Sequence, residues 1–149
     1  MSIKNEILIH CKQVLTEKVH SFKEKLNELV SDAENDSKSS AGDKHETARA
    51  MMQIEQEKLI TQFNEADRQL EILASINPDE EVKSVRTGAL VETNKGMLFL
   101  SIPLGKITIK NSDIMVISAI APLAKAMMNA KKKETVSFNG TDYLIKNIS

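Results

Sequence analysis

Hydrophobic residues recur at alternating steps of three and four through the first half of this chain. Before a polar stretch at residues 35–42 they are Leu8, Cys11, Leu15, Val19, Phe22, Leu26, Leu29 and Ala33. After it they are Ala48, Met52, Leu59, Phe63, Ala66, Leu70 and Leu73. This spacing places them on one face of a helix. Two such helices joined by a short polar turn predict an antiparallel coiled-coil hairpin over residues 1–77, with an acidic tip near residues 36–46.

The pattern changes at Asn77-Pro78, because proline ends a helix and disfavours helical backbone at the preceding residue. Beyond it, short strands are predicted at residues 89–92, 97–102, 106–109, 114–118, 135–138 and 143–148. Asn139-Gly140 is the pair that a two-residue hairpin turn favours. Pro122 suits the first position of a short helix over residues 122–130, with Leu123, Ala126, Met127 and Ala130 facing the sheet.

Residues 78–149 are therefore predicted to form a small antiparallel sheet packed on one helix, and the whole chain to be α+β. Each arm of the hairpin would be roughly 50 Å long at ~1.5 Å per residue. A domain of about 70 residues is much narrower than this, so we expect the hairpin to project from the second domain.

Composition adds modest limits. The chain has 149 residues, of which 41% are hydrophobic, and it contains one cysteine. A single cysteine cannot form an internal disulfide, and the chain opens without a charged and then apolar leader, so we expect a reducing cytoplasm. No apolar run approaches the roughly 18 residues of a membrane span.

The net charge of -1 conceals an asymmetry. Residues 1–80 hold 10 Lys and Arg against 16 Asp and Glu, whereas residues 81–149 hold 10 against 5. Residues 1–80, which include the hairpin, thus carry -6, and residues 81–149 carry +5. An acidic arm argues against binding along a nucleic-acid backbone, which requires clustered Lys and Arg. The solvated faces of a coiled coil are also normally charged, so the charge has a structural explanation as well.

Asp43 and Glu46 lie three residues apart at the predicted tip. Asp at a helix N-cap followed by Glu at the third helical position is a capping box. The same spacing places both carboxylates on one helix face, where they could offer oxygens to Mg²⁺. Two protein ligands would leave the metal mostly hydrated, so a partner would have to supply the rest.

Two segments resemble a known family. Gly42-Asp43-Lys44-His45-Glu46-Thr47-Ala48 resembles the Gly-Asp-x-x-Glu-Asn-Ala tip of the Gre-type transcript-cleavage factors of bacterial RNA polymerase. Far along the chain, Ile117-Ser118-Ala119-Ile120-Ala121-Pro122-Leu123-Ala124 resembles the Ile-Ser-x-x-Ser-Pro-(Ile or Leu)-Ala segment of their carboxyl-terminal domain. The predicted hairpin over residues 136–148 is similar to that domain's final strands, so the resemblance covers nearly the whole chain in order.

The resemblance implies a transcription elongation factor that is not itself an enzyme. An FKBP-like second domain would dock on the polymerase as a monomer, with Ser118, Pro122, Leu123 and Lys125 in the contact. The coiled coil would enter the secondary channel. Asp43 and Glu46 would then hold a Mg²⁺ ion shared with the polymerase, which cleaves its own backtracked RNA. Lys44 and Arg49 are candidate contacts to the RNA 3′ end, and any direct contact with DNA or RNA would be weak.

The chain departs from the family pattern at three positions. Thr47 replaces the Asn after the Glu, Ala50 replaces an aromatic residue, and Ala121 replaces the Ser before the Pro. Gre homologues that occupy the channel without cleaving are known, so a regulator or inhibitor of the polymerase is an alternative. A more remote alternative is a structural protein whose coiled coil mediates association, which would need an exposed apolar stripe beyond the internal seam.

Other residues have simpler interpretations. Cys11 lies on the apolar seam and is expected to be a small buried hydrophobe. His45 has no His or Cys partner at metal-ligand spacing. Lys131-Lys132-Lys133 would complement the carboxyl end of the short helix or contact the polymerase. Prolyl isomerase activity is not expected from an FKBP-like fold here, because the second domain has too few aromatic residues to line such a pocket.

Overall fold

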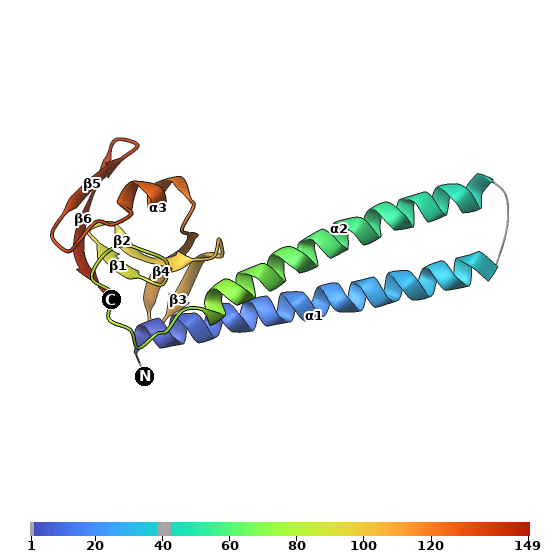
Figure 1. Cartoon of the computed structure of the whole chain (residues 1–149), viewed down its shortest axis with the longest axis horizontal. Helices are drawn as coiled ribbons and strands as arrows, with labels where there is room; N and C mark the ends of the chain where they lie inside the picture. Colours follow the sequence, from blue (N-terminus) through green and yellow to red (C-terminus); the bar gives the residue numbers. More distant parts are fainter. Residues whose placement is uncertain (1, 39–42) are drawn as a thin grey trace. The chain divides into compact units, whose positions relative to one another are not determined.

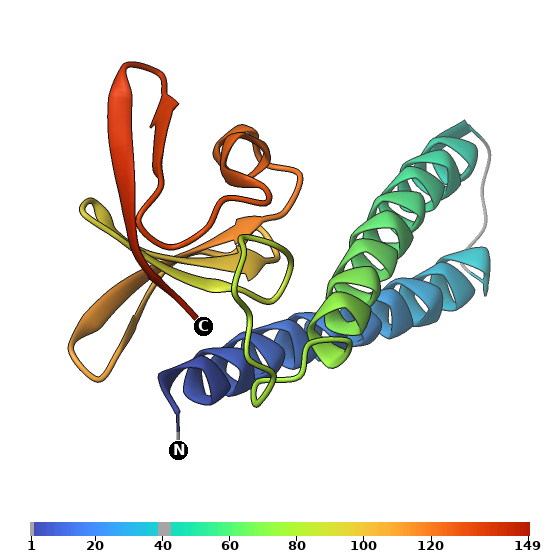
Figure 2. The same cartoon turned by 60° about the vertical axis from the view of Figure 1, so that its left-hand side comes forward.

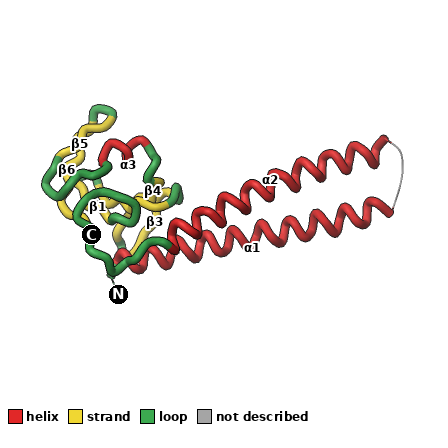
Figure 3. Tube along the Cα trace, in the orientation of Figure 1, coloured by secondary structure: helices red, strands yellow, loops and turns green. Residues whose placement is uncertain are grey.

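The computed structural model describes residues 2–38 and 43–149; for residues 33–38 and 43–45 it describes the helical backbone without the side chains. Two long helices come first, α1 (Ile3–Lys38) and α2 (Asp43–Ala74), and they run antiparallel (Figure 1). Figure 3 shows that almost all helical structure lies in this first half and all strands in the second. Within the described residues, no helix is long and apolar enough to cross a membrane.

The predicted apolar seam is the least exposed face of the two helices. Leu15, Leu59 and Ala66 are buried, and the seam positions between them are half-buried. One contact between the helices is a cation–π interaction, with Lys23 Nζ 5.6 Å from the centre of the Phe63 ring. Because each helix of a two-helix hairpin has only one neighbour, its seam is shielded only partly, which accounts for the half-buried positions.

By its contacts the chain forms two compact units. One comprises residues 13–70, and the other comprises residues 1–12 together with residues 71–149. The second unit therefore contains the beginning of α1 and the end of α2, where Ile7, Leu8, Cys11 and Leu73 are buried. The domain boundary predicted after residue 77 is a statement about parts of the chain that could fold separately, so it stays a prediction.

The second unit contains a six-stranded sheet. Its strands are β1 (Leu90–Thr93), β2 (Gly96–Ser101), β3 (Gly105–Ile109), β4 (Ser112–Ser118), β5 (Thr135–Phe138) and β6 (Thr141–Ile148). The spatial order is β3-β4-β2-β1-β6-β5. With α3 (Pro122–Met127) it gives the predicted α+β class, and the predicted strands agree with these to within two residues.

The expectation of a purely antiparallel sheet is wrong at one pairing. Strands β2 and β4 are parallel, with Met97 opposite Ile114 and Leu100 opposite Ile117. The reason is the position of β3, which does not return beside β2 but pairs antiparallel with the far edge of β4. Strand β4 thus lies between β2 and β3 and runs in the direction of β2, so the sheet is mixed.

Of the tight turns that join neighbouring antiparallel strands, two have positive φ at both central residues. Asn139 and Gly140 have φ of 50° and 77°, so the predicted Asn-Gly turn between β5 and β6 is confirmed. Lys110 and Asn111, with φ of 49° and 65°, make a similar turn between β3 and β4 that the sequence analysis did not identify. Positive φ is unusual for a lysine, so the sequence Lys110-Asn111 does not predict such a turn clearly.

Helix α3 is shorter than predicted, since it ends at Met127, and its buried residues are Ala124 and Met127. Of the four residues predicted to face the sheet, Met127 and Ala130 belong to the buried core and Leu123 packs against it, but Ala126 is exposed. Ala124 and Met127 are three residues apart and so share one face of a helix with fewer than two turns. They join a core that includes Val85, Val91 and Ile145, and α3 contacts β5 (Figure 2).

Candidate functional site

The acidic tip can be located by the helix that follows it. Helix α2 begins at Asp43, so Asp43 and Glu46 both lie in its first turn. Glu46 is exposed. Residues 39–42 and the side chains of Asp43, Lys44 and His45 lie outside what the structure describes, so both the capping box and the metal-holding role stay predictions.

The donor chemistry of this first turn fits a hard cation. Carboxylates at positions i and i+3 lie on the same side of a helix, and Mg²⁺ prefers oxygen ligands. Glu46 is exposed, so its carboxylate is accessible to a partner. Among the residues whose side chains are described, no group of three or more His, Cys, Asp or Glu could hold a metal alone.

Most of the described side chains in the first two turns of α2 are exposed to solvent. Thr47, Arg49 and Ala50 are exposed, whereas Ala48 is half-buried on the seam side. Arg49 is thus available to a ligand at this end of the helix. Lys44, the second candidate RNA contact, lies among the side chains that are not described.

The second predicted segment joins the end of β4 to the start of α3. The backbone N–H of Ala121 donates to the Ser118 carbonyl at 3.0 Å, and the N–H of Ile120 donates to Ser118 Oγ at 3.3 Å. These bonds close a tight turn. Pro122 then occupies the start of α3 as predicted, and Ala121 at the N-cap offers no side-chain hydrogen bond.

The predicted contact residues in this segment do not all face solvent. Pro122 and Lys125 are exposed, Ser118 is half-buried, and Leu123 is half-buried because it packs against the core. Leu123 therefore helps to hold α3 on the sheet, and only part of its side chain is accessible to a partner. Ile120, which sequence reasoning did not single out, is 72% exposed and is the most exposed of the large hydrophobic residues in the described chain.

We call Ile120, Pro122 and Lys125 the β4–α3 surface. Ile120 lies in the turn that the Ala121–Ser118 hydrogen bond closes, and its exposed side chain contributes little to folding, although its burial would stabilise the protein by about 1.5–3 kcal/mol. A single exposed apolar residue is common on protein surfaces. Here it is followed along the chain by the exposed Pro122 and Lys125, so the segment offers an apolar group and a cation to solvent.

The lysine run 131–133 does not cap α3, contrary to one of its two interpretations. The helix ends four residues before Lys131, and its last turn contains Lys125 instead. Asn129, with φ of 69°, turns the chain away, and Lys131 then forms a bridge with Ser84. All three lysine residues are exposed, so their charges remain available on the second unit.

Cys11 is fully buried, as predicted. Burial raises the pKa of its thiol to about 11, because a thiolate would be poorly solvated there. At neutral pH the group is therefore a neutral thiol. The expectation that Cys11 is a buried hydrophobe is confirmed, and it has none of the features of a reactive cysteine.

No protein-family model matches this chain, and no curated protein matches it. Among solved structures, a similar chain is described as "Structure of the transcription factor Gfh1", at 14% sequence identity. The alignment covers 92% of each chain with a TM-score of 0.34. This low TM-score does not establish a shared fold, and the function of the chain is argued from its own residues.

Proposed function

We propose that this protein is an accessory factor of a bacterial RNA polymerase that stimulates cleavage of backtracked RNA. The observation that carries the proposal is the start of α2 at Asp43, which places Asp43 and Glu46 in the first turn of a 32-residue helix paired with α1. Both acids thus belong to the end of a long antiparallel hairpin, where the resemblance to Gre-type factors requires them.

The second unit supports the same proposal through the segment similar to the Gre carboxyl-terminal domain. That segment forms a turn and a helix start with Ile120, Pro122 and Lys125 exposed. The excess of positive charge in residues 81–149, which includes Lys131, Lys132 and Lys133, would favour a partner with an acidic surface. In this proposal the β4–α3 surface docks on the polymerase, and the hairpin supplies its acids to the polymerase active site.

Asp43 and Glu46 would hold the shared Mg²⁺ by their carboxylate oxygens. When bound there, the ion would help generate the attacking hydroxide and offset charge on the phosphodiester. Arg49 is exposed one turn further along α2 and could offset charge on the RNA 3′ end. The factor itself would carry out no reaction in the absence of the polymerase.

The test separates metal holding from helix capping. Asp43→Asn retains a good N-cap residue, and Glu46→Gln can still complete a capping box, but each removes a charged ligand. We expect both full-length variants to bind the polymerase normally and to lose at least tenfold in cleavage of RNA in a halted, backtracked complex, or about 1.4 kcal/mol. Glu57→Gln, at another exposed acid of α2, is the matched control and should cleave normally.

Undiminished cleavage by both tip variants would refute the metal-holding role. A protein that binds the polymerase and never cleaves would instead support the second candidate, a channel-binding regulator or inhibitor. The exposed Ala50 favours that second candidate. Gre-type factors have an aromatic residue at this position, and the alanine methyl group could neither stack on a base nor reach as far as an aromatic ring.

Docking is best tested in the full chain. The isolated fragment 78–149 would lack residues 1–12 and 71–77 of its own compact unit and expose the apolar groups that they cover. We expect Ile120→Ser and Lys125→Gln to weaken competition for the polymerase severalfold while preserving the fold, since both side chains are exposed. Lys95→Gln, at an exposed lysine of the β1–β2 turn, should compete normally. Equal competition by all three would exclude the β4–α3 surface from docking.

A further inference from the structure

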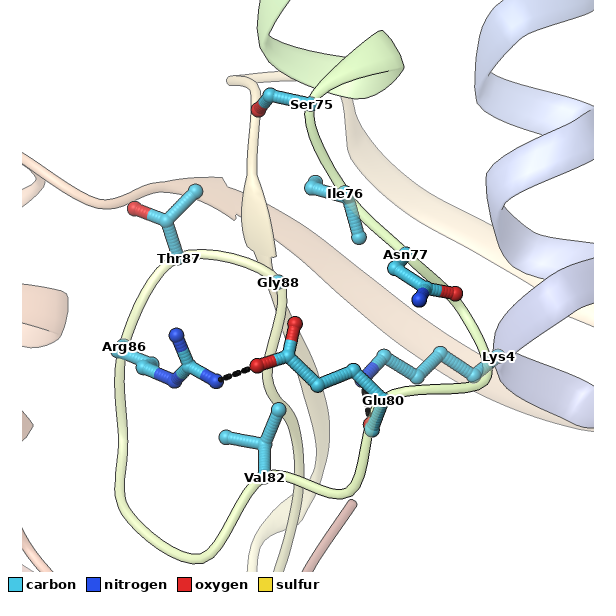
Figure 4. Close-up of a pocket in the computed structure, with 9 residues that line it drawn as sticks. All are labelled: Lys4, Ser75, Ile76, Asn77, Glu80, Val82, Arg86, Thr87 and Gly88. Atoms are coloured by element: carbon cyan, nitrogen blue, oxygen red, sulfur yellow. Dashed lines mark hydrogen bonds and ion pairs between the residues drawn. The ribbon is translucent and has the colours of Figure 1, made fainter.

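A small pocket in the second unit contains a buried lysine that the proposed function does not use. Lys4, the second residue of α1, is only 4% exposed, although lysine is almost never buried without a partner. It lines a pocket of about 150 Å³ formed with the segment that follows α2 (Figure 4). The other residues that matter here are Asn77, Glu80, Arg86, Thr87 and Gly88.

The ammonium of Lys4 is poorly satisfied for a buried cation. Lys4 Nζ donates to the backbone carbonyl of Glu80 at 3.5 Å, which is the long limit of a hydrogen bond. The Glu80 carboxylate itself is bound to Arg86, with Oε1 at 2.7 Å from the guanidinium. Figure 4 shows Lys4 and Arg86 reaching toward Glu80 from opposite sides.

The electrostatics of the pocket favour an added negative charge. The residues that line the pocket include two cationic side chains, Lys4 and Arg86, and one carboxylate, Glu80. Burial has the largest effect and lowers the pKa of Lys4, the Glu80 charge raises it, and the Arg86 charge lowers it by less than Glu80 raises it. Lys4 also lies in the first turn of α1, where the helix dipole disfavours a cation and would favour an anion.

We propose that this pocket binds a small oxyanion of the phosphate class between Lys4 and Arg86. Phosphate offers several acceptor oxygens, which could take the remaining donors of both cations and offset their repulsion. The volume of about 150 Å³ is far above the roughly 15 Å³ that a single water needs, yet small for a ligand of drug size. It fits inorganic phosphate or the terminal group of a phosphomonoester.

Binding here would join three segments of the second unit. Lys4 belongs to α1, Glu80 to the segment after α2, and Arg86 to the loop before β1. An anion held by both cations would add a bridge between α1 and this loop beyond the single long hydrogen bond. The bound protein should therefore be more stable than the free protein, as for any ligand specific to the folded state.

The experiment is an amide NMR titration of the full-length protein with sodium phosphate, against sodium chloride at matched ionic strength. We expect saturable shifts at Lys4, Asn77, Thr87 and Gly88, with a dissociation constant on the order of 1 mM, which is typical of a weak single-ion site. Adenosine monophosphate serves as the second arm. Equal affinity would identify the terminal phosphate of a larger molecule as the ligand, and binding of inorganic phosphate alone would identify the free ion.

Lys4→Met keeps most of the apolar stem and removes the charge, and it should weaken phosphate binding at least tenfold. Arg86→Gln should weaken it as well and provides a second variant if Lys4→Met does not fold. Lys83→Met, at an exposed lysine of the same segment, is the control and should bind normally. No saturable shift in the unaltered protein, or shifts confined to residues outside the pocket, would overturn the proposal. The assay contains no polymerase, so its result is independent of the cleavage test.

Discussion

Because the Cys11 thiol is buried, we expect the free energy of unfolding to depend on pH in a specific way. Its pKa is raised to about 11 in the folded protein, against about 9.0 for an ordinary thiol. Between these two values the unfolded chain loses the thiol proton and the folded chain keeps it. The contribution of the protonated Cys11 thiol to the free energy of unfolding is therefore fully present below pH 9, and it is lost as the pH rises from 9 through 11.

The size of the effect follows from the two pKa values. At pH 10 the unfolded thiol would be about 90% ionised and the folded thiol about 10%, which lowers the free energy of unfolding by about 1.4 kcal/mol relative to pH 8. Other groups also change the stability of the protein at alkaline pH. A Cys11→Ala variant retains all of those groups and lacks only the thiol, so the difference between the two proteins isolates the effect.

The assay is urea unfolding of both proteins at pH 8, 9 and 10, since the linear extrapolation gives a free energy at each pH. Cys11→Ala should be less stable at pH 8 because it leaves a small cavity. The gap between the two proteins should then narrow by about 1.4 kcal/mol at pH 10. Parallel pH profiles would refute the raised pKa and with it the complete burial of the thiol. A thiol-reactive dye that labelled the native protein rapidly at pH 8 would contradict it independently.

Three further substitutions test the second unit by urea unfolding. Ala121→Ser supplies the missing N-cap hydroxyl of α3 and should stabilise the protein by about 1 kcal/mol, whereas a loss of stability would show that the turn cannot accept it. Met127→Ala should destabilise it by about 2–5 kcal/mol because Met127 is fully buried, with the exposed Ala126→Ser expected within about 0.5 kcal/mol. Gly140→Ala should cost about 1 kcal/mol because Gly140 has φ of 77°, and no loss would contradict the positive-φ turn.

The candidate site could be predicted only in part. The Asp-x-x-Glu spacing predicts a helix start, and α2 does begin at Asp43. The side-chain geometry at the tip is not described, so the role of the two acids rests on resemblance. Ile120 was missed because an isoleucine between a strand and a helix has the same hydrophobic pattern as a core residue, and only the folded structure shows that it is exposed in the turn that joins β4 to α3.

The local elements of this protein are determined by the sequence itself. The three-and-four spacing specifies which face of each long helix is apolar, because that relation depends only on helical geometry. The strands and the Asn139-Gly140 turn are likewise local, and Asn-Gly suits positive φ in any context. Cys11 could be predicted as buried because it lies within that periodic face.

Only the tertiary structure decides which distant segments meet. The parallel pairing of β2 with β4 depends on where β3 goes, and no residue within β2 specifies it. The burial of Lys4 depends on a segment more than 70 residues away, whose Glu80 and Arg86 complete the pocket. A lysine near a chain end is normally solvated, so its sequence neighbours give no sign of this environment. Periodicity reports the faces of single elements, whereas pairing and enclosure arise from long-range contacts that periodicity does not encode.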